Sequence, residues 1–161
     1  MDRQKFEFSF EVYDNINELR GDDQSLLNQA RCVTSKAYAP YSNFSVGAVA
    51  KLSNGKIVEG GNQENASFPV GICAERVVLA AISSLYPETS IDTMAISYNS
   101  KLVKSNHPIS PCGMCRQGLL EFESRMKKPI RLILGGMEGK VYVVESSSQL
   151  LPLAFTGEEL P

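Results

Sequence analysis

Two short cysteine-containing stretches, Cys73-Ala74-Glu75 and Pro111-Cys112-Gly113-Met114-Cys115, place the strongest constraint on how this chain can fold. Each has the pattern of a helix start. Helix N-termini carry free N–H groups and partial positive charge, and both features stabilise thiolates. If two such helices run side by side, their N-termini bring three thiolates to one point. The fold should therefore place one helix start beside the other.

Three converging thiolates are a suitable zinc site. Structural zinc sites usually have four protein ligands, whereas catalytic sites have three and keep one tetrahedral position open for water. Glu75 lies two residues after Cys73, and in the first turn of a helix both side chains can approach a group beyond its end. A carboxylate in that place can transfer protons. The pattern favours a hydrolytic site containing one Zn²⁺ ion, with Glu75 as its acid–base group.

Three thiolates would leave the zinc centre with a net negative charge, which weakens its ability to acidify water. A neighbouring cation would offset this charge, and N–H donors to sulfur would have a similar effect. Arg76 is adjacent to the first stretch, while Arg116 and Gln117 follow the second. These three side chains are the candidate supporting residues.

Other interpretations of the cysteines and the histidine remain open. A Cys-x-x-Cys pair alone also occurs in structural half-sites and redox pairs, and the addition of Cys73 with Glu75 favours catalysis over structural zinc. Cys32 falls within a predicted helix and is interpreted as a small core residue. His107, the single histidine, precedes Pro108 in a loop. It is either a fourth ligand or an exposed loop residue, and the second interpretation is preferred.

Composition sets further limits on the class of protein. The 161 residues fit one domain, and the formal net charge of −2 argues against binding dominated by nucleic-acid phosphates. The N-terminal residues lack the apolar stretch of a secretory signal, and no apolar run approaches the ~20 residues of a membrane span. We therefore expect a cytoplasmic protein that does not bind membranes and whose four cysteines stay reduced.

Hydrophobic periodicity predicts a single three-layer α/β domain, with a mixed sheet of about five strands covered by helices. Helices are expected from Asp22 or Asp23 to about Tyr38, from near Cys73, and from Pro111 to about Arg125. Strands are expected over residues 46–52, 56–60, 93–98, 130–134 and 141–144. Residues 22–161 would form the catalytic domain. Residues 1–21 would form an N-terminal extension, in which the alternating residues 6–12 suggest an edge strand.

The chain resembles the cytidine deaminases at five separated motifs that occur in order. Zinc deaminases carry a ligand-x-Glu element followed by Pro-Cys-x-x-Cys, and both cysteine stretches match this signature in its three-cysteine form. Residues 38–48 resemble the first substrate segment of the family and residues 61–69 its nucleoside-binding loop. Residues 110–117 and 150–155 also fit. Ser45 stands where the family usually has proline, and the first ~20 residues have no counterpart.

The resemblance implies roles for the matching residues. Cys73, Cys112 and Cys115 would hold one zinc ion per subunit, and Glu75 would transfer protons. The implied substrate contacts are Asn62 and Glu64 at the ribose hydroxyls, Phe44 against the base, the Ala66 and Ala74 backbone at the pyrimidine edge, and the Ser110 carbonyl at the amino group. In the small-subunit branch of the family, four chains form a homotetramer, and the C-terminal phenylalanine, here Phe155, reaches a neighbouring site.

The activity implied is hydrolytic deamination of cytidine and deoxycytidine in pyrimidine salvage. Blasticidin S deaminase also resembles the chain near both zinc motifs, but the run from Asn62 to Asn65 favours an ordinary nucleoside. A nucleic-acid-editing deaminase is disfavoured by the slightly acidic chain, which lacks a stripe of aromatic and basic residues. A zinc-binding module without enzymatic activity is the alternative from a different class.

Overall fold

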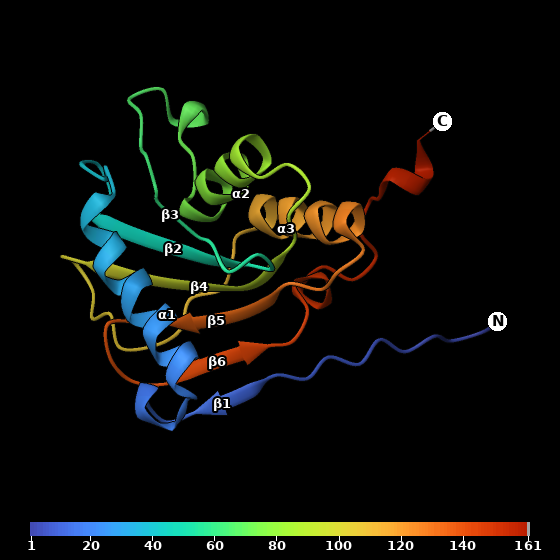
Figure 1. The fold of residues 1–161 in the computed structure, drawn as a ribbon, viewed down its shortest axis with the longest axis horizontal. Helices are drawn as coiled ribbons and strands as arrows, with labels where there is room; N and C mark the ends of the chain where they lie inside the picture. Colours follow the sequence, from blue (N-terminus) through green and yellow to red (C-terminus); the bar gives the residue numbers. More distant parts are fainter. Residues whose placement is uncertain (161) are drawn as a thin grey trace.

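A six-stranded mixed sheet forms the centre of the computed structural model, which describes residues 1–160 (Figure 1). Its order is β1-β6-β5-β4-β2-β3. The strands are β1 (Glu11–Tyr13), β2 (Phe44–Leu52), β3 (Ile57–Gly61), β4 (Ile91–Ser100), β5 (Arg131–Gly135) and β6 (Val141–Val144). The helices are α1 (Gly21–Val33), α2 (Ala74–Leu85) and α3 (Gly113–Met126). The predicted α/β architecture is confirmed.

Among the six strands of the sheet, only β4 and β5 pair in parallel, with Thr93 opposite Arg131 at one end of the register and Ile96 opposite Leu134 at the other. Parallel neighbours need a crossover connection, and α3 lies in the segment that joins these two strands. The other four pairs are antiparallel. The crossover places the start of α3 at the end of the sheet where β4 finishes.

Helices cover both faces of the sheet. Leu27, Ala30 and Val33 of α1 join a core that includes Val49 and Ile133. On the other face, apolar residues of α2 and α3 share a larger core with β2, β4 and β5; it includes Val78, Ile82, Leu119, Phe122 and Ile96. Alternation along β2 supplies both cores, because successive side chains point to opposite faces. The layers therefore place α2 and α3 side by side.

Two glycines allow the helices to lie close to their neighbours. A Cβ atom at Gly47 would lie 2.2 Å from the Ala30 carbonyl oxygen, so α1 can pack against β2 only at this small residue. A Cβ atom at Gly118 would lie 3.3 Å from Cδ1 of Leu79. Gly118 is on α3 and Leu79 is on α2. The second contact thus draws together the two helices that begin at the cysteines.

The N-terminal strand is shorter than the alternating residues 6–12 predict. Glu11, Val12 and Tyr13 pair with Val143, Tyr142 and Val141, which places β1 at one edge of the sheet. β6 ends at Val144, so residues before Phe10 extend past the strand that could pair with them. The sixth strand accounts for the difference from the expected five.

The start and end of α1 also differ from expectation. Arg20, rather than an aspartate, occupies the N-cap position, and both aspartates lie in the first turn. Asp23 is instead held by Arg131, whose Nη1 and Nη2 each donate at 2.9 Å. The helix ends at Val33 and continues as a 3₁₀ turn, Thr34–Lys36, so it does not reach Tyr38. Hydrophobic spacing located α1 but did not locate its ends.

The positions of Pro111 and Cys32 differ from expectation. Pro111 precedes α3, whose N-cap is Cys112, rather than lying in its first turn. Cys32 is exposed on α1 rather than part of the core.

Among the helices within residues 1–160, none has the length and apolar character needed to cross a membrane.

Candidate metal centre and substrate pocket

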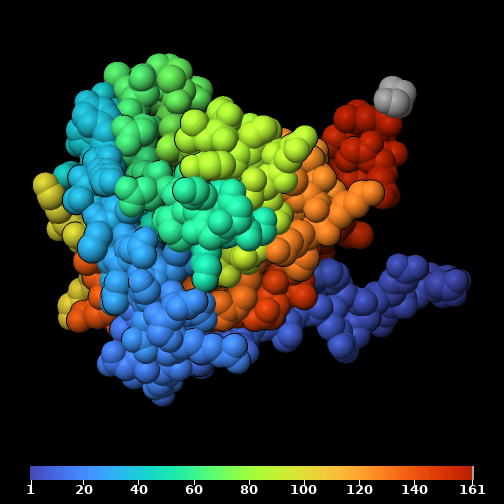
Figure 2. All heavy atoms as spheres, in the orientation of Figure 1, coloured from blue at the N-terminus to red at the C-terminus, as the bar shows by residue number. Residues whose placement is uncertain are grey.

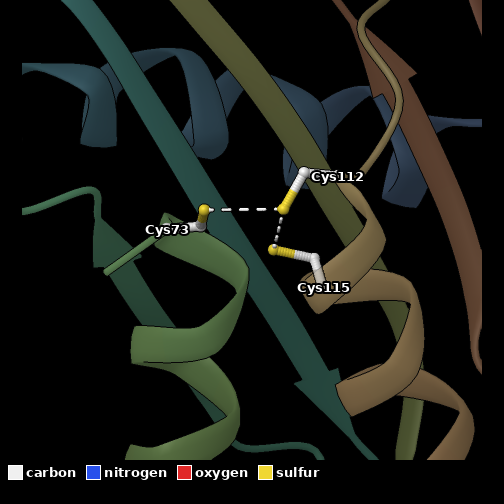
Figure 3. Close-up of side chains that lie close together, drawn as sticks. All are labelled: Cys73, Cys112 and Cys115. Carbon is white, nitrogen blue, oxygen red and sulfur yellow. Dashed lines mark hydrogen bonds between the residues drawn. The ribbon is translucent and has the colours of Figure 1, made fainter. Parts of the chain in front are cut away.

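The N-termini of α2 and α3 meet at three cysteine side chains (Figure 3). Cys73 is the N-cap residue of α2 and Cys112 that of α3, while Cys115 lies in the first turn of α3. The sulfur atoms of Cys73 and Cys112 are 3.8 Å apart, and those of Cys112 and Cys115 are 3.5 Å apart. Within residues 1–160, these thiols form the one cluster of three or more candidate metal ligands.

The geometry of the thiols fits a tetrahedral zinc ion. Zn–S bonds of about 2.3 Å at tetrahedral angles place neighbouring sulfur atoms about 3.8 Å apart. The two shorter sulfur–sulfur distances match this spacing, and all three sulfur atoms lie within 4.8 Å of one another. Three protein ligands leave the fourth position for a non-protein ligand, as in catalytic zinc sites. The donor set therefore suits zinc in an open site.

Contacts among the thiols favour the charged form of one of them. A hydrogen bond from Cys115 lowers the pKa of Cys73 to about 6, with a smaller contribution from the positive charge of Arg76. The same contact raises the pKa of Cys115, and burial adds to this effect. The cluster can therefore present a thiolate to an incoming metal ion, and metal binding removes the remaining thiol protons.

Glu75 is buried next to this cluster. Its position in the first turn of α2 directs it inward, and its side chain is 5% exposed. Burial raises the pKa of the Glu75 carboxyl, and hydrogen bonding from its own backbone N–H opposes this shift, with a smaller contribution from Cys115. A carboxyl group in such surroundings can both accept and donate a proton, which is the property expected of a proton-transfer group.

The side chains of Arg116 and Gln117 donate to carbonyl oxygens rather than to sulfur. Arg116 Nε donates to the Pro111 carbonyl at 2.9 Å, and its Nη1 donates to the Leu150 carbonyl at 2.9 Å. Gln117 Nε2 donates to the Phe155 carbonyl at 3.0 Å. These two residues fix the loop before α3 and the C-terminal tail. Arg76 acts on Cys73 through its charge.

A cavity of about 500 Å³ adjoins the metal centre at Cys73. Its walls include two of the residues implied in ribose binding, Asn62 and Glu64. Tyr41, Phe68 and Ile72 add apolar surface to the same cavity. A mostly apolar cleft with a few convergent polar groups is the usual form of a small-molecule site. The thiol cluster and the polar groups of the 62–72 loop therefore share one pocket.

Asn62 and Glu64 also hydrogen-bond to backbone groups of residues 41–46 beside the pocket. Asn62 Oδ1 accepts from the Val46 N–H at 2.7 Å, and its Nδ2 donates to the Phe44 carbonyl at 3.0 Å. Glu64 Oε2 accepts from the N–H groups of Tyr41 and Ser42, at 2.9 and 3.3 Å. Hydrogen bonding from Ser42 lowers the pKa of Glu64. The pocket therefore contains an ionised carboxylate at neutral pH.

The ring of Phe44 stacks on the ring of Tyr98. Their ring centroids are 4.9 Å apart, and the ring planes differ by 17°. The Tyr98 hydroxyl lies 3.2 Å from Nδ1 of His107, and this histidine is not a member of the cysteine cluster. His107 is therefore an exposed loop residue that contacts Tyr98, in line with the preferred interpretation.

The remaining predicted site residues are dispersed over three segments. Ala74 is buried at the first position of α2, and Ala66 is exposed in the loop before it. Ser110 is exposed just before Pro111. Phe155 lies in the tail with 58% of its surface exposed. Within this single chain, these residues do not complete a closed pocket.

Some residues around the pocket have roles that the sequence did not reveal. Tyr41 and Phe68 line the cavity and contact each other, with ring centroids 5.9 Å apart. Both lie inside the segments that resemble the deaminase motifs, and that position is the signal that could have identified them. The support given to Phe44 by Tyr98 depends on the pairing of β2 with β4. No local pattern near either residue contains that information.

Comparison with protein families gives a match to the cytidine and deoxycytidylate deaminase zinc-binding region over residues 20–130. This range includes all three clustered cysteines, Glu75 and the 62–72 loop. It excludes the N-terminal residues before Arg20 and the C-terminal tail. The match therefore covers most of the chain and both walls of the pocket.

Individual relatives agree with the family match. A cytidine deaminase of Halalkalibacterium halodurans is 35% identical over 139 residues, covering 86% of this chain and 98% of the relative. The crystal structure of cytidine deaminase from Burkholderia pseudomallei superposes with a TM-score of 0.70 at 37% identity, covering 81% of this chain and 97% of that one. The crystal structure of cytidine deaminase from Mycobacterium tuberculosis superposes with a TM-score of 0.65 at 30% sequence identity, covering 84% of this chain and 98% of that one. The chain thus belongs to the zinc-dependent cytidine and deoxycytidylate deaminase family.

Proposed function

We propose that this protein hydrolyses the amino group of cytidine, and of deoxycytidine, to give uridine or deoxyuridine and ammonia. The observation that carries this proposal is the buried carboxylate of Glu75 in the first turn of α2, two residues after Cys73. Cys73 belongs both to the cluster of three thiols and to the wall of the pocket that contains Asn62 and Glu64. The relatives named cytidine deaminase support the same reaction. The role proposed for this reaction is pyrimidine salvage, and the compartment proposed is the cytoplasm.

Cys73, Cys112 and Cys115 would hold the zinc ion. Bound there, zinc would supply a Lewis acid that makes water nucleophilic near neutral pH. Glu75 would take a proton from the attacking water and deliver it to ring N3, which makes C4 electrophilic. Glu75 would then take the remaining proton from the new hydroxyl on C4 and pass it to the amino nitrogen, so that the C4–N bond breaks, ammonia leaves and the oxygen becomes the C4 carbonyl. Glu75 acts in turn as base and acid, and its burial excludes bulk water from these transfers.

The same pocket would select a free nucleoside. Asn62 and Glu64 would bind the ribose hydroxyls, since each retains hydrogen-bonding capacity beyond its contacts within the chain. The negative charge of Glu64 would repel a 5′-phosphate. Phe44 would pack on the base, where Tyr98 holds its ring in place. Among the remaining contacts, the backbone of Ala66 and Ala74 would meet the pyrimidine edge, and the Ser110 carbonyl the amino group.

The assembly proposed is a homotetramer in which each site receives Phe155 from a neighbouring chain. Support comes from the exposure of Phe155 and from the hydrogen bond by which Gln117 fixes its backbone. Sedimentation analysis of the purified protein would give a mass four times that of the chain. A monomeric mass would contradict this assembly without affecting the proposed reaction within each pocket.

An ultraviolet deamination assay tests the proposed function directly. Zinc-loaded protein should convert cytidine and deoxycytidine, with loss of the cytosine absorbance and release of one ammonia per base. A protein that binds zinc yet leaves the spectrum unchanged would instead be a zinc-binding module without activity. Blasticidin S should be a much poorer substrate, because Asn62 and Glu64 favour an ordinary nucleoside whose ribose hydroxyls they would bind. A preference for blasticidin S would favour the alternative activity.

A further inference from the structure

Residues Met1–Phe10 leave the body of the molecule as an extended arm that continues β1 (Figures 1 and 2). The match to the deaminase family begins at residue 20, so this arm lies outside it. Nothing in the proposed reaction uses these residues. The arm nevertheless has a strongly patterned sequence, with phenylalanine at every second position from Phe6 to Phe10.

These phenylalanines form one apolar stripe. Phe6, Phe8 and Phe10 are 57%, 42% and 44% exposed. The rings of Phe8 and Phe10 stack with centroids 5.5 Å apart, and Phe10 lies 4.9 Å from the ring of Tyr142. Tyr142 packs against the core beneath α2 and α3. The stripe therefore extends an apolar face of the sheet into solvent, along a strand that has no neighbour on its outer side.

The sequence of the arm is complementary to itself when it is reversed. In an antiparallel pair of identical strands centred on Phe8, that residue lies opposite its own copy. Phe6 then lies opposite Phe10, and Lys5 lies opposite Glu11. Directly opposed side chains in antiparallel strands point to the same face. All six phenylalanines of the two arms would share one face, and each lysine would meet a glutamate on the other.

Alternative pairings of two arms lack this complementarity. A parallel pairing in register would place Lys5 opposite Lys5, Glu7 opposite Glu7 and Glu11 opposite Glu11. Like charges directly opposite each other are destabilising. Moving the antiparallel register by one residue would place phenylalanines opposite charged or polar residues and would divide the stripe between two faces. The charge and aromatic patterns therefore select one partner and one register.

We propose that residues 5–11 pair, in antiparallel orientation about Phe8, with the same segment of a second copy of this chain. Exposed edge strands with apolar side chains readily recruit further strands, and a symmetric pair satisfies the free backbone groups of both arms at once. The interface would lie outside the residues that match the family. It is thus independent of the proposed function and of a tetramer built from residues 22–160.

Disulfide trapping tests the pairing. Cys32 is exposed, so the experiment uses Cys32→Ser as background, with zinc bound to protect the other three thiols. Addition of Phe8→Cys should give a covalent dimer under mild oxidation, seen by non-reducing denaturing electrophoresis, because position 8 opposes itself. The Cys32→Ser parent should remain a single chain. A Phe8→Cys protein that deaminates cytidine normally but does not cross-link would overturn the proposal.

Two further variants test the register. Phe6→Cys and Phe10→Cys proteins should remain single chains when oxidised separately, and they should form a mixed dimer when combined, because positions 6 and 10 are opposed. Cross-linking of each protein with itself would indicate a parallel pair and would contradict the proposed register. A dimer in the Phe8→Cys protein without the mixed dimer would indicate contact between arms without strand pairing, which also overturns it.

A charge reversal tests the predicted pair between Lys5 and Glu11. In the single chain, Lys5 contacts Glu7, and Glu11 accepts from the Tyr13 hydroxyl at 2.7 Å. Lys5→Glu, added to the Phe8→Cys protein, should slow dimer trapping several-fold. The new glutamate at position 5 of each copy would lie opposite Glu11 of the other copy, and the two like charges would repel. Addition of Glu11→Lys should restore most of the rate. Equal trapping rates in all three proteins would show that these charges are not opposed.

Discussion

Glu75 is the residue on which the proposed chemistry depends most directly, because its buried carboxyl lies in the first turn of α2 and its charge acts on both Cys73 and Cys115. Glu75→Gln keeps the size of the side chain but removes its ability to accept and return a proton. We expect the deamination rate constant for cytidine to fall by about 10³-fold, within the range usual for loss of an acid–base group. Zinc content, measured on the purified variant, should be unchanged.

Glu121→Gln is the matched control for this change. Glu121 is an exposed residue of α3, so the same substitution there should leave the rate constant unaffected. If Glu75→Gln retained both zinc and wild-type turnover, proton transfer by this carboxylate would be disproved. Loss of zinc in the variant would instead assign Glu75 a part in metal binding.

Glu64 should determine the discrimination between nucleoside and nucleotide. Hydrogen bonding keeps the pKa of its carboxyl low, so the pocket is negatively charged at neutral pH. Glu64→Gln replaces a charge-assisted hydrogen bond to a ribose hydroxyl by a neutral one, a change that costs about tenfold in kcat/KM for cytidine. It also removes the repulsion of a phosphate. Steady-state kinetics should therefore show a smaller ratio of kcat/KM for cytidine to that for its 5′-phosphate.

The exposed Glu59 provides the comparison for Glu64. Glu59 lies on β3 and pairs with Lys36, so Glu59→Gln should preserve the ratio between the two substrates. An unchanged ratio in Glu64→Gln as well would mean that Glu64 acts only within the chain. In that case, its hydrogen bonds to Tyr41 and Ser42 would be its whole role.

At the scale of single residues, the sequence predicted positions correctly where the spacing of residues along a helix determines which side chains lie together. Cys112 and Cys115 lie one helical turn apart, and the structure places Cys73 beside them at the start of α2. Cys32 shows where such reasoning fails, because a cysteine within an amphipathic helix can lie on either face. The acceptor of Gln117 was not predictable, since the Phe155 carbonyl reaches it only when the C-terminal tail folds back over α3.

At the scale of elements, α3 connects the metal centre to the C-terminal segment. Its first turn carries Cys115, and near its other end Glu123 is buried at 8% exposure. Glu123 Oε1 accepts from the N–H of Ile130 at 2.6 Å and from the N–H and hydroxyl of Ser147 at 2.8 and 2.9 Å. The other oxygen accepts from the Ser148 N–H at 3.2 Å. One carboxylate thus fixes both the start of β5 and the turn after β6.

Glu123→Gln should therefore destabilise the protein. The amide has one acceptor oxygen in place of two, and its NH₂ group would face donors that need an acceptor. Buried donors left unsatisfied cost about 1–3 kcal/mol, so we expect the free energy of unfolding to fall by ~2 kcal/mol or more. Urea denaturation measures this change, with Glu121→Gln as the control on the same helix. Equal midpoints for the two variants would contradict the structural role.

The role of Glu123 could not be inferred from the sequence, although the helix that carries it could. Apolar spacing predicted α3 closely, whereas the serines that donate to Glu123 lie after two further strands. The boundaries of helices and strands likewise divide into those that local sequence determines and those that depend on distant parts of the chain. Asn54 and Gly55 located the turn between β2 and β3, because that pair forms a tight turn locally. The start of β1 depended instead on where β6, a strand distant in sequence, ends.

At the scale of the whole molecule, the order of helices and strands was sufficient to predict a layered α/β domain. The strand order was not predictable, because it depends on which edges pair once the layers pack. The edge position of β1 illustrates this point: it brings the start of the chain beside a strand near its end, Val141–Val144. That pairing also determines where the N-terminal arm emerges and hence where a second copy would meet it.

Zinc should stabilise the whole fold, because its three ligands belong to the starts of two helices that share one core. Binding to the folded state alone adds about 4 kcal/mol when free zinc exceeds its Kd a thousandfold. For a chain of this size, removal of zinc by a chelator should lower Tm by roughly 10 °C. Readdition of zinc should restore Tm, and Cys112→Ser should reduce the response, whereas Cys32→Ser should preserve it. A Tm that does not respond to chelation, in a protein shown by elemental analysis to have lost zinc, would mean that packing of α2 against α3 alone holds the site together.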